Sequence, residues 1–233
     1  MSAAVPLPLR LVPGLGLDRA AWSPTLARLA AGGRTDLEVV ELHGYGRRGG
    51  SRADLRPGAL AEELLAACPE APVVLMGHSA SCQVVAEAAR QRPDRVAGLV
   101  LVGPTTDSRA RSWPSLSGRW LATACRERPG QVPTLVRQYA RTGVGTMVRA
   151  MDAARRHDVG QALAGARCPA LVLRGRHDRI CPGDWAAHLA GTAAANDPRS
   201  RCTTLDAGAH MVPLTHGRLV AAEVGRFLAG LAH

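Results

Sequence analysis

Short apolar runs alternate along the chain with longer stretches whose apolar residues recur at helical spacing. The short runs are bounded by Gly, Pro and polar residues, which is typical of buried strands. Strands are predicted at residues 7–12, 37–42, 72–76, 96–102, 170–173 and 202–205. Helices are predicted at residues 19–31, 59–68, 81–92, 184–190 and 217–231, with Asp18 and Asp184 as N-caps of the first and the fourth. The Gly- and Arg-rich segment 43–56 is predicted to be a loop.

This alternation predicts the fold class. Strands that alternate with helices form βαβ units, and nearly continuous apolar strands indicate a parallel sheet covered on both faces. We therefore expect an α/β fold with a doubly wound, mostly parallel sheet. The alternation of strands and helices is interrupted between residues 104 and 166, where only helical segments are predicted. We expect residues 104–166 to be a helical cap inserted into a core formed by residues 1–103 and 167–233.

The sharpest chemical signal is the stretch from residue 73 to 81, an apolar strand that leads through Gly-His-Ser-Ala-Ser into a helix. A tight strand-to-helix turn lifts a serine oxygen clear of the sheet, and small flanking residues let strand and helix pass closely. Gly77 and Ser81 are the small residues around Ser79. The alternative is that Ser79 only caps the helix.

These residues resemble the nucleophile elbow of the α/β-hydrolase family, Gly-x-Ser-x-Gly, with Ser81 in place of the second glycine. The resemblance implies that Ser79 is the nucleophile and that the amide of Ala80 forms half of an oxyanion hole. The other half would be Leu15, in the loop Pro-Gly-Leu-Gly after the first strand, where Pro13 replaces the His that the family usually has. An ordinary glycine-rich turn is the alternative for that loop.

The resemblance also implies an acid and a base, in the family order Ser, acid, His. Asp178 follows the strand at 170–173 in a segment similar to the family's acid loop, Gly-x-x-Asp with Pro soon after. Asp107, after the strand at 96–102, is the rival acid. His210 lies after the last strand, where the family's base belongs, although Ala209 separates it from Gly208.

Composition narrows the function classes. The formal net charge is +10, but every basic residue is Arg and the arginines are scattered without interleaved aromatics, so nucleic-acid binding is not expected. The six cysteines form no CxxC pair, and we expect neither a disulfide framework nor a metal site. No apolar run is long enough for a membrane span and no secretory signal is evident, so a cytoplasmic protein is expected.

The sequence thus predicts a cofactor-free serine hydrolase that cleaves a small-molecule ester, thioester or lactone through an acyl-enzyme. Trp113, Trp120 and Tyr139 are the expected substrate contacts of the cap, with packing as their alternative role. Arg137 and Arg141 either attract an anionic substrate or form a solvated face. Carbon–carbon hydrolysis, a lyase or cyclase reaction with His210 as base, and slow-turnover ligand binding remain alternatives on the same scaffold.

Overall fold

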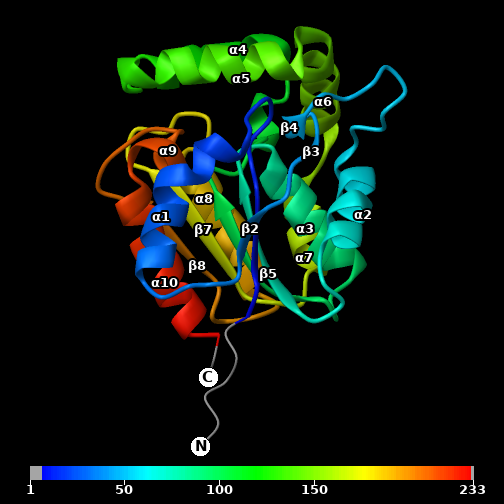
Figure 1. Cartoon of the computed structure of the whole chain (residues 1–233), viewed down its shortest axis with the longest axis vertical. Helices are drawn as coiled ribbons and strands as arrows, with labels where there is room; N and C mark the ends of the chain where they lie inside the picture. Colours follow the sequence, from blue (N-terminus) through cyan, green and yellow to red (C-terminus); the bar gives the residue numbers. More distant parts are fainter. Residues whose placement is uncertain (1–6, 232–233) are drawn as a thin grey trace, which may run out of the picture.

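A six-stranded parallel sheet forms the centre of the molecule (Figure 1). A computed structural model describes residues 7–231 of the chain. The strand order is β2-β1-β5-β6-β7-β8, and every neighbouring pair runs parallel. The strands are β1 (Leu9–Val12), β2 (Leu37–Val39), β5 (Val73–His78), β6 (Val96–Val102), β7 (Ala170–Gly175) and β8 (Arg201–Leu205). The predicted α/β class with a parallel sheet is confirmed.

Helices cover both faces of this sheet because successive strand residues point to opposite sides. In β5, Leu75 belongs to one buried cluster, whereas Val74 and Met76 belong to the other. The first cluster lies under α2 (Pro57–Ala67), α3 (Ser81–Gln91), α7 (Val159–Gly165) and α8 (Gly183–Ala194). The second lies under η1 (Arg19–Trp22), α1 (Ser23–Ala31), α9 (Val212–Thr215) and α10 (Gly217–Ala229). The result is a three-layer arrangement with two apolar cores.

The described segment between β6 and β7 contains helices joined by loops and no strand. It contains η2 (Ser108–Ala110), α4 (Trp113–Ala124), η3 (Pro129–Gln131), α5 (Val132–Thr142), α6 (Val144–Arg156) and α7. In Figure 1, α4 and α5 lie across the top of the sheet with α6 beside them, whereas α7 packs against α3 and α8 in the helical layer. We propose that the cap consists of η2 to α6 and that α7 belongs to the core.

Hydrogen bonds join the cap to loops of the core. The Thr142 hydroxyl donates to the carbonyl of Gly16 (3.2 Å), and the Thr146 hydroxyl donates to that of Gly49 (3.0 Å). The amide of Asp18 donates to the side chain of Gln138 (3.0 Å). These contacts hold α5 against the loop that follows β1 and α6 against the loop that follows β4.

Two local predictions needed correction. The strand predicted at 37–42 stops at residue 39, and the segment predicted as loop contains β4 (Gly46–Arg47), which pairs with β3 (Leu42–His43). Gly44 (φ +82°) lies between β3 and β4 and Gly46 (φ +98°) begins β4, and both occupy the left-handed region that glycine tolerates best.

The two predicted helix caps have different outcomes. The side chain of Asp18 accepts a hydrogen bond from the amide of Ala20 (2.9 Å), so its prediction as a cap is confirmed. The prediction for Asp184 is wrong, because α8 starts earlier and its N-cap is Pro182. Asp184 lies in the first turn and pairs with Arg109 instead (2.6 Å).

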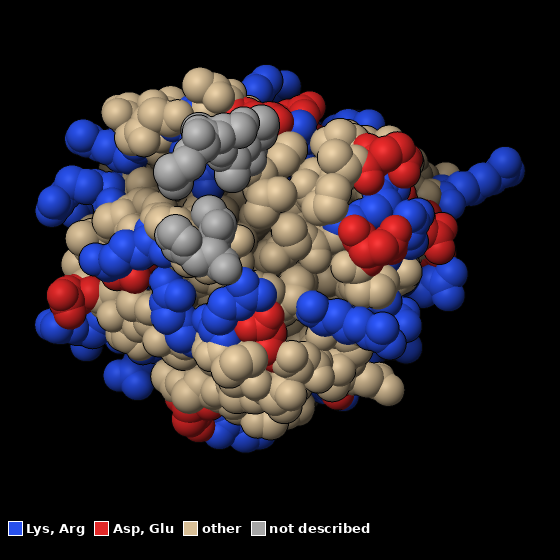
Figure 2. Space-filling model, turned by 90° about the horizontal axis from the view of Figure 1, so that it is seen from below, with Lys and Arg blue, Asp and Glu red and all other residues tan. Residues whose placement is uncertain are grey.

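Arginine side chains are spread over the face seen in Figure 2, with acidic side chains among them. The six cysteines are free thiols. Within residues 7–231 no helix has the length and apolar character needed to cross a bilayer, and no three His, Cys, Asp or Glu side chains cluster in a way that could hold a metal ion.

Candidate active site

Ser79 occupies a strained turn between β5 and α3. Its φ of +59° makes it the only residue other than glycine in the left-handed region within the described chain. Such a conformation costs about 1–3 kcal/mol and persists only where the surroundings enforce it. A Cβ on Gly77 would lie 2.8 Å from the amide nitrogen of Cys82, so only glycine allows strand and helix to pass this closely. The geometry is that of a nucleophile elbow.

Ser81, the residue that replaces the second glycine of the motif, reinforces the turn. Its Oγ is 2.8 Å from the amide of His78, from which it accepts a hydrogen bond, and 2.9 Å from the carbonyl of Val12, to which it donates. The side chain is fully buried. The hydroxyl therefore ties the start of α3 to the end of β1, a link that glycine could not make.

Asp178 and His210 form a buried pair at the carboxyl ends of β7 and β8. Oδ2 of Asp178 lies 2.8 Å from Nδ1 of His210, and its Oδ1 accepts hydrogen bonds from the amides of Ile180 and Cys181, both at 2.9 Å. Burial alone would raise the pKa of Asp178, but the charge and hydrogen bond of His210 hold it below its usual value. Burial alone would lower the pKa of His210, yet the Asp178 carboxylate raises it.

The loops that carry this pair are braced against each other. The buried Arg174 donates to the carbonyls of Cys181 and Asp178, both at 2.8 Å, and so fixes the loop after β7. A Cβ on Gly175 would come within 2.2 Å of the carbonyl oxygen of Ala209, which precedes the histidine. The glycine in the predicted acid loop is therefore required by the close approach of the loop that holds His210.

His78 was not singled out by the sequence, yet it lies beneath the site. Its Nε2 is 2.9 Å from the backbone oxygen of His210, and a Cβ on Gly14 would come within 2.8 Å of its Nδ1. Burial, followed by repulsion from His210, lowers the pKa of His78 to about 3, so it is neutral at pH 7. The neutral ring donates from Nε2 and links the end of β5 to the loop after β8. A histidine at the end of an otherwise apolar strand was the signal that could have identified it.

Ser79 and His210 face the same cavity, of about 410 Å³. Nδ1 of His210 is hydrogen-bonded to Asp178, so Nε2 is the nitrogen that remains available to the serine. Within residues 7–231 this Nε2 makes no hydrogen bond. The Ser79 hydroxyl likewise has no hydrogen bond to His210 in the described chain, an arrangement common in unliganded sites. The backbone of Ser79 is fixed by donation of its amide to the carbonyl of Val102 (2.8 Å).

The amide of Ala80 follows Ser79 in the turn into α3, and the amide of Leu15 lies in the loop after β1, the strand that pairs with β5. Neither donates a hydrogen bond within the described part of the chain. The loop that carries Leu15 is itself fixed, because the Gly16 amide donates to the carbonyl of Gly44 (2.8 Å). Two adjacent loops therefore present free donors near the serine.

The predicted aromatic residues Trp113, Trp120 and Tyr139 all line the cavity. The sequence missed the apolar residues Met147 and Met151 of α6, which complete its wall. Arg137 and Arg141 are not part of the lining; both are exposed, and Arg141 lies 3.7 Å from Asp18.

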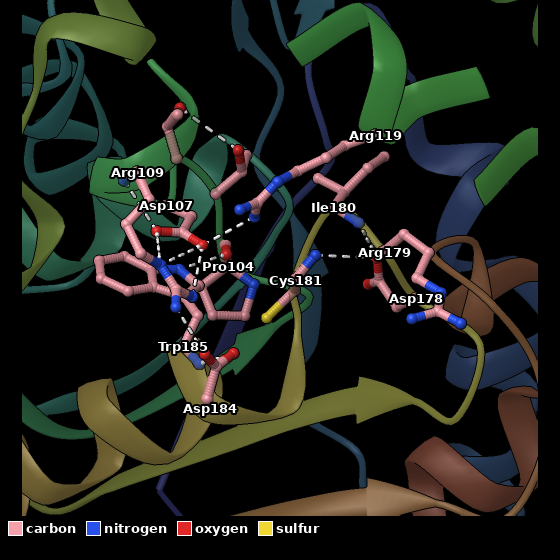
Figure 3. Close-up of polar contacts among 12 residues, drawn as sticks. Pro104, Asp107, Arg109, Arg119, Asp178, Arg179, Ile180, Cys181, Asp184 and Trp185 are labelled. Atoms are coloured by element: carbon pink, nitrogen blue, oxygen red, sulfur yellow. Dashed lines mark hydrogen bonds and ion pairs between the residues drawn. The ribbon is translucent and has the colours of Figure 1, made fainter. Parts of the chain in front are cut away.

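Asp107, the rival acid, has different partners. It is fully buried, and its carboxylate pairs with Arg109 (2.8 Å) and with Arg119 of α4 (2.7 Å), as Figure 3 shows. Burial alone would raise the pKa of Asp107, but these two guanidinium groups lower it to about 2. Asp178 lies beyond Ile180 and Cys181 in the same view and is the carboxylate that pairs with the histidine.

A family model described as the alpha/beta hydrolase family matches residues 11–223. The chain belongs to this family. Pimeloyl-[acyl-carrier protein] methyl ester esterase of Xanthomonas campestris is 28% identical over 251 residues, which cover 96% of this chain and 95% of that enzyme. The enzyme of the same name from Klebsiella pneumoniae is 30% identical over 200 residues, 75% of this chain and 76% of its own length. The chain is thus a carboxylesterase-like α/β-hydrolase.

Solved structures agree on the fold. A structure described among the carboxylesterases of Nitrososphaera gargenis superposes with a TM-score of 0.76 at 17% identity and covers 99% of this chain and 93% of its own. The enol-lactonase of Burkholderia xenovorans gives 0.73 at 18% identity, with 98% and 94% covered. At these identities the likeness concerns the fold and leaves the reaction open.

Proposed function

We propose that this α/β-hydrolase cleaves carboxylic esters through an acyl-enzyme on Ser79, with His210 as general base and Asp178 as the residue that orients it. The observation that carries the proposal is the buried Asp178–His210 pair, whose histidine lines the same cavity as a serine held at positive φ. A serine hydroxyl needs such a base to act as a nucleophile. The names of the curated relatives put carboxylic esters ahead of thioesters and lactones as the substrate class.

In the first half-reaction, Nε2 of His210 takes the proton of Ser79 as Oγ bonds to the carbonyl carbon. The negative charge that develops on the carbonyl oxygen is stabilised by the amides of Leu15 and Ala80, whose free donors support this role. The bond from carbon to the alcohol oxygen then breaks, and the proton on His210 passes to that oxygen. An alcohol leaves and the acyl group stays on Ser79.

The second half-reaction regenerates the enzyme. His210 takes a proton from water as the water oxygen attacks the acyl carbon, and the same proton returns to Oγ of Ser79 when the acid leaves. Throughout, the Asp178 carboxylate holds Nδ1–H of His210 and stabilises the imidazolium. Ester and water are converted to acid and alcohol, with no electron acceptor or further reactant involved.

The test compares hydrolysis of short- and medium-chain p-nitrophenyl esters by wild type, Ser79→Ala and Ser117→Ala, with fluorophosphonate labelling in parallel. Ser117 is a matched control because it is a second serine of the cavity wall that lies on α4, away from the elbow. We expect Ser79→Ala to abolish turnover and labelling and Ser117→Ala to keep both.

Each other outcome has a definite meaning. Labelling of Ser79 without turnover of any ester would contradict ester hydrolysis and favour a lyase or cyclase reaction. Absence of both labelling and turnover in folded wild-type protein would overturn the nucleophile assignment and favour a ligand-binding role.

A further inference from the structure

A second cavity, of about 260 Å³, adjoins the one that contains Ser79. It lies between the carboxyl-terminal half of α4 and the helix α5, and no step of the reaction described above uses it. The two cavities share a wall made of one cap surface and the loops after β7 and β8. The shared residues are Trp120, Tyr139, Ile180, His210 and Met211.

The free surface of the second cavity is apolar. Ala124, Val132, Leu135 and Val136 line it. The polar side chain of Glu127 in its wall is already engaged: Oε1 accepts from the amide of Met211 (2.7 Å) and Oε2 from the side chain of Gln131 (3.0 Å).

The side chain of Thr123, another polar residue of that wall, is engaged as well. The Thr123 hydroxyl donates to the carbonyl of Arg119 (2.9 Å) and accepts from the amide of Arg179 (3.1 Å). Apart from Oε1 of Gln131, the Tyr139 hydroxyl and Nε2 of His210, an occupant of the second cavity meets carbon, so an apolar group fits it best.

The two cavities differ in which catalytic groups they expose. Ser79 and Leu15 line only the larger cavity, whereas His210 lines both. In ester cleavage the histidine hands its proton to the leaving oxygen, so the leaving alcohol has to lie on the histidine's side of the acyl carbon. The geometry points to a bipartite site in which the acyl chain fills the larger cavity and an apolar alcohol chain fills the cavity between α4 and α5.

This inference rests on the proposed ester hydrolysis and names its substrate class: an ester with two apolar arms, one on each side of the scissile bond. The curated relatives are named for methyl esters. Methanol as leaving group would leave most of the 260 Å³ cavity unfilled, so its apolar wall would contribute nothing to transition-state binding. A longer alcohol would use that wall.

Two residues of α4 allow a matched test. Ser117 lines only the larger cavity and Ala124 only the smaller one. They are seven positions apart, which is about two helical turns and places them on the same side of the helix. Both are exposed, so Ser117→Phe and Ala124→Phe fill one cavity each without disturbing a buried core.

The experiment measures kcat/KM by direct product detection for two ester series: butyrates of methanol to hexanol, and methyl esters of butyrate to octanoate. In wild type we expect kcat/KM to rise with alcohol length, by up to about fourfold per methylene, which is the fold-change for burying one CH₂. Ala124→Phe should abolish that rise and keep the dependence on acyl length. Ser117→Phe should do the opposite.

Binding of 1-hexanol, followed by ligand-observed NMR, gives a readout that is independent of turnover. Loss of binding in Ala124→Phe with retention in Ser117→Phe supports the inference even if no ester is hydrolysed, a result that would overturn only the proposed function. Hydrolysis of all esters without dependence on alcohol length, or a crossed pattern in which Ala124→Phe affects the acyl series, would overturn the inference and leave ester hydrolysis standing.

Discussion

Asp107 and Asp178 follow neighbouring strands of the sheet and are both fully buried, yet the structure uses them differently. Asp178 pairs with a histidine that faces the cavity, whereas Asp107 pairs with two arginines, one of which belongs to the cap helix α4. Position at the carboxyl edge of the sheet and burial are thus common to both carboxylates. The cationic partner is what differs.

The comparison teaches that the same sheet edge can serve catalysis and cap attachment at adjacent strands. Arg119 is one helical turn before Thr123, whose hydroxyl accepts from the amide of Arg179 (3.1 Å), so α4 is tied to both loops. Asp107, in the loop after β6, pairs with Arg119 of the cap helix α4, whereas Asp178, in the loop after β7, pairs with His210 of the loop after β8. Substitutions at the two carboxylates should therefore separate chemistry from cap positioning.

Asp178→Asn should have the largest effect. The amide cannot hold Nδ1–H of His210 in the tautomer that the reaction needs, and in Ser-His-Asp enzymes this error lowers kcat by about 10⁴-fold. The measurement is kcat for a p-nitrophenyl ester, with fluorophosphonate labelling rate as a second readout. The matched control is Asp107→Asn, for which we expect kcat to change by less than about tenfold. A larger loss of kcat in Asp107→Asn than in Asp178→Asn would reverse the assignment of the acid.

Asp107→Asn should instead act on stability. It leaves Arg109 and Arg119 without their carboxylate, and hydrogen bonds to charged groups contribute about 1.5–3 kcal/mol when buried. Because Arg109 is half exposed, we expect a smaller loss of about 1–2 kcal/mol in the free energy of unfolding, measured by urea denaturation. KM should rise because α4 carries Trp113 and Trp120 of the cavity wall.

The pH dependence of the stability lost in Asp107→Asn is the control that tests whether the ion pairs of Asp107 cause it. The pKa of Asp107 is held near 2 in the folded protein, below its ordinary 3.8, so its stabilisation is present above pH 4 and is lost as the pH falls toward 2. The difference in unfolding free energy between wild type and Asp107→Asn should shrink over that range. A difference that stays constant would show that the ion pairs are not its cause.

The sequence predicted an elbow at Ser79, an acid loop at Asp178 and a base loop at His210 because each of these predictions depends on local chemistry. Ser79 sits where a strand turns into a helix, Asp178 follows a strand closely, and His210 follows the last strand. Parallel strands bring such loops to one edge of the sheet. Local motifs were therefore sufficient to predict that Asp178 and His210 lie close together.

The acid-loop pattern favoured Asp178 over Asp107, but the partners that distinguish the two carboxylates lie outside the local sequence. Asp107 and Asp178 differ in partners that lie 12 and 32 positions away, namely Arg119 and His210. For the same reason the sequence did not reveal the role of His78, whose partner is 132 positions away. Contacts of this kind depend on the folded geometry, which hydrophobic periodicity does not specify.

The pH profile of kcat/KM should separate the two carboxylates again, with a smaller effect. In the proposed mechanism neutral His210 is the base, so we expect activity to be lost as the pH falls through the pKa of His210, which Asp178 raises above 6.5. In Asp178→Asn the burial remains but the charge is gone, so the acid limb of the residual activity should move to lower pH. Asp107→Asn should leave the limb where it is in wild type. A shift in Asp107→Asn equal to that in Asp178→Asn would show that the two loops are electrostatically coupled.

Asp184→Ala should have the smallest effect of these variants on the free energy of unfolding and on kcat. Asp184 extends the Asp107 cluster through its ion pair with Arg109 at 2.6 Å, but both side chains are more than half exposed (63% and 54%). Exposed pairs contribute about 0–1 kcal/mol and are screened by salt. Arg109 also keeps its bonds to Asp107 in this variant. We therefore expect no measurable change in the free energy of unfolding from urea denaturation and an unchanged kcat. A loss as large as that of Asp107→Asn would mean that the cluster stabilises the cap as one unit, and that burial of Asp107 is not what separates it from its exposed neighbour.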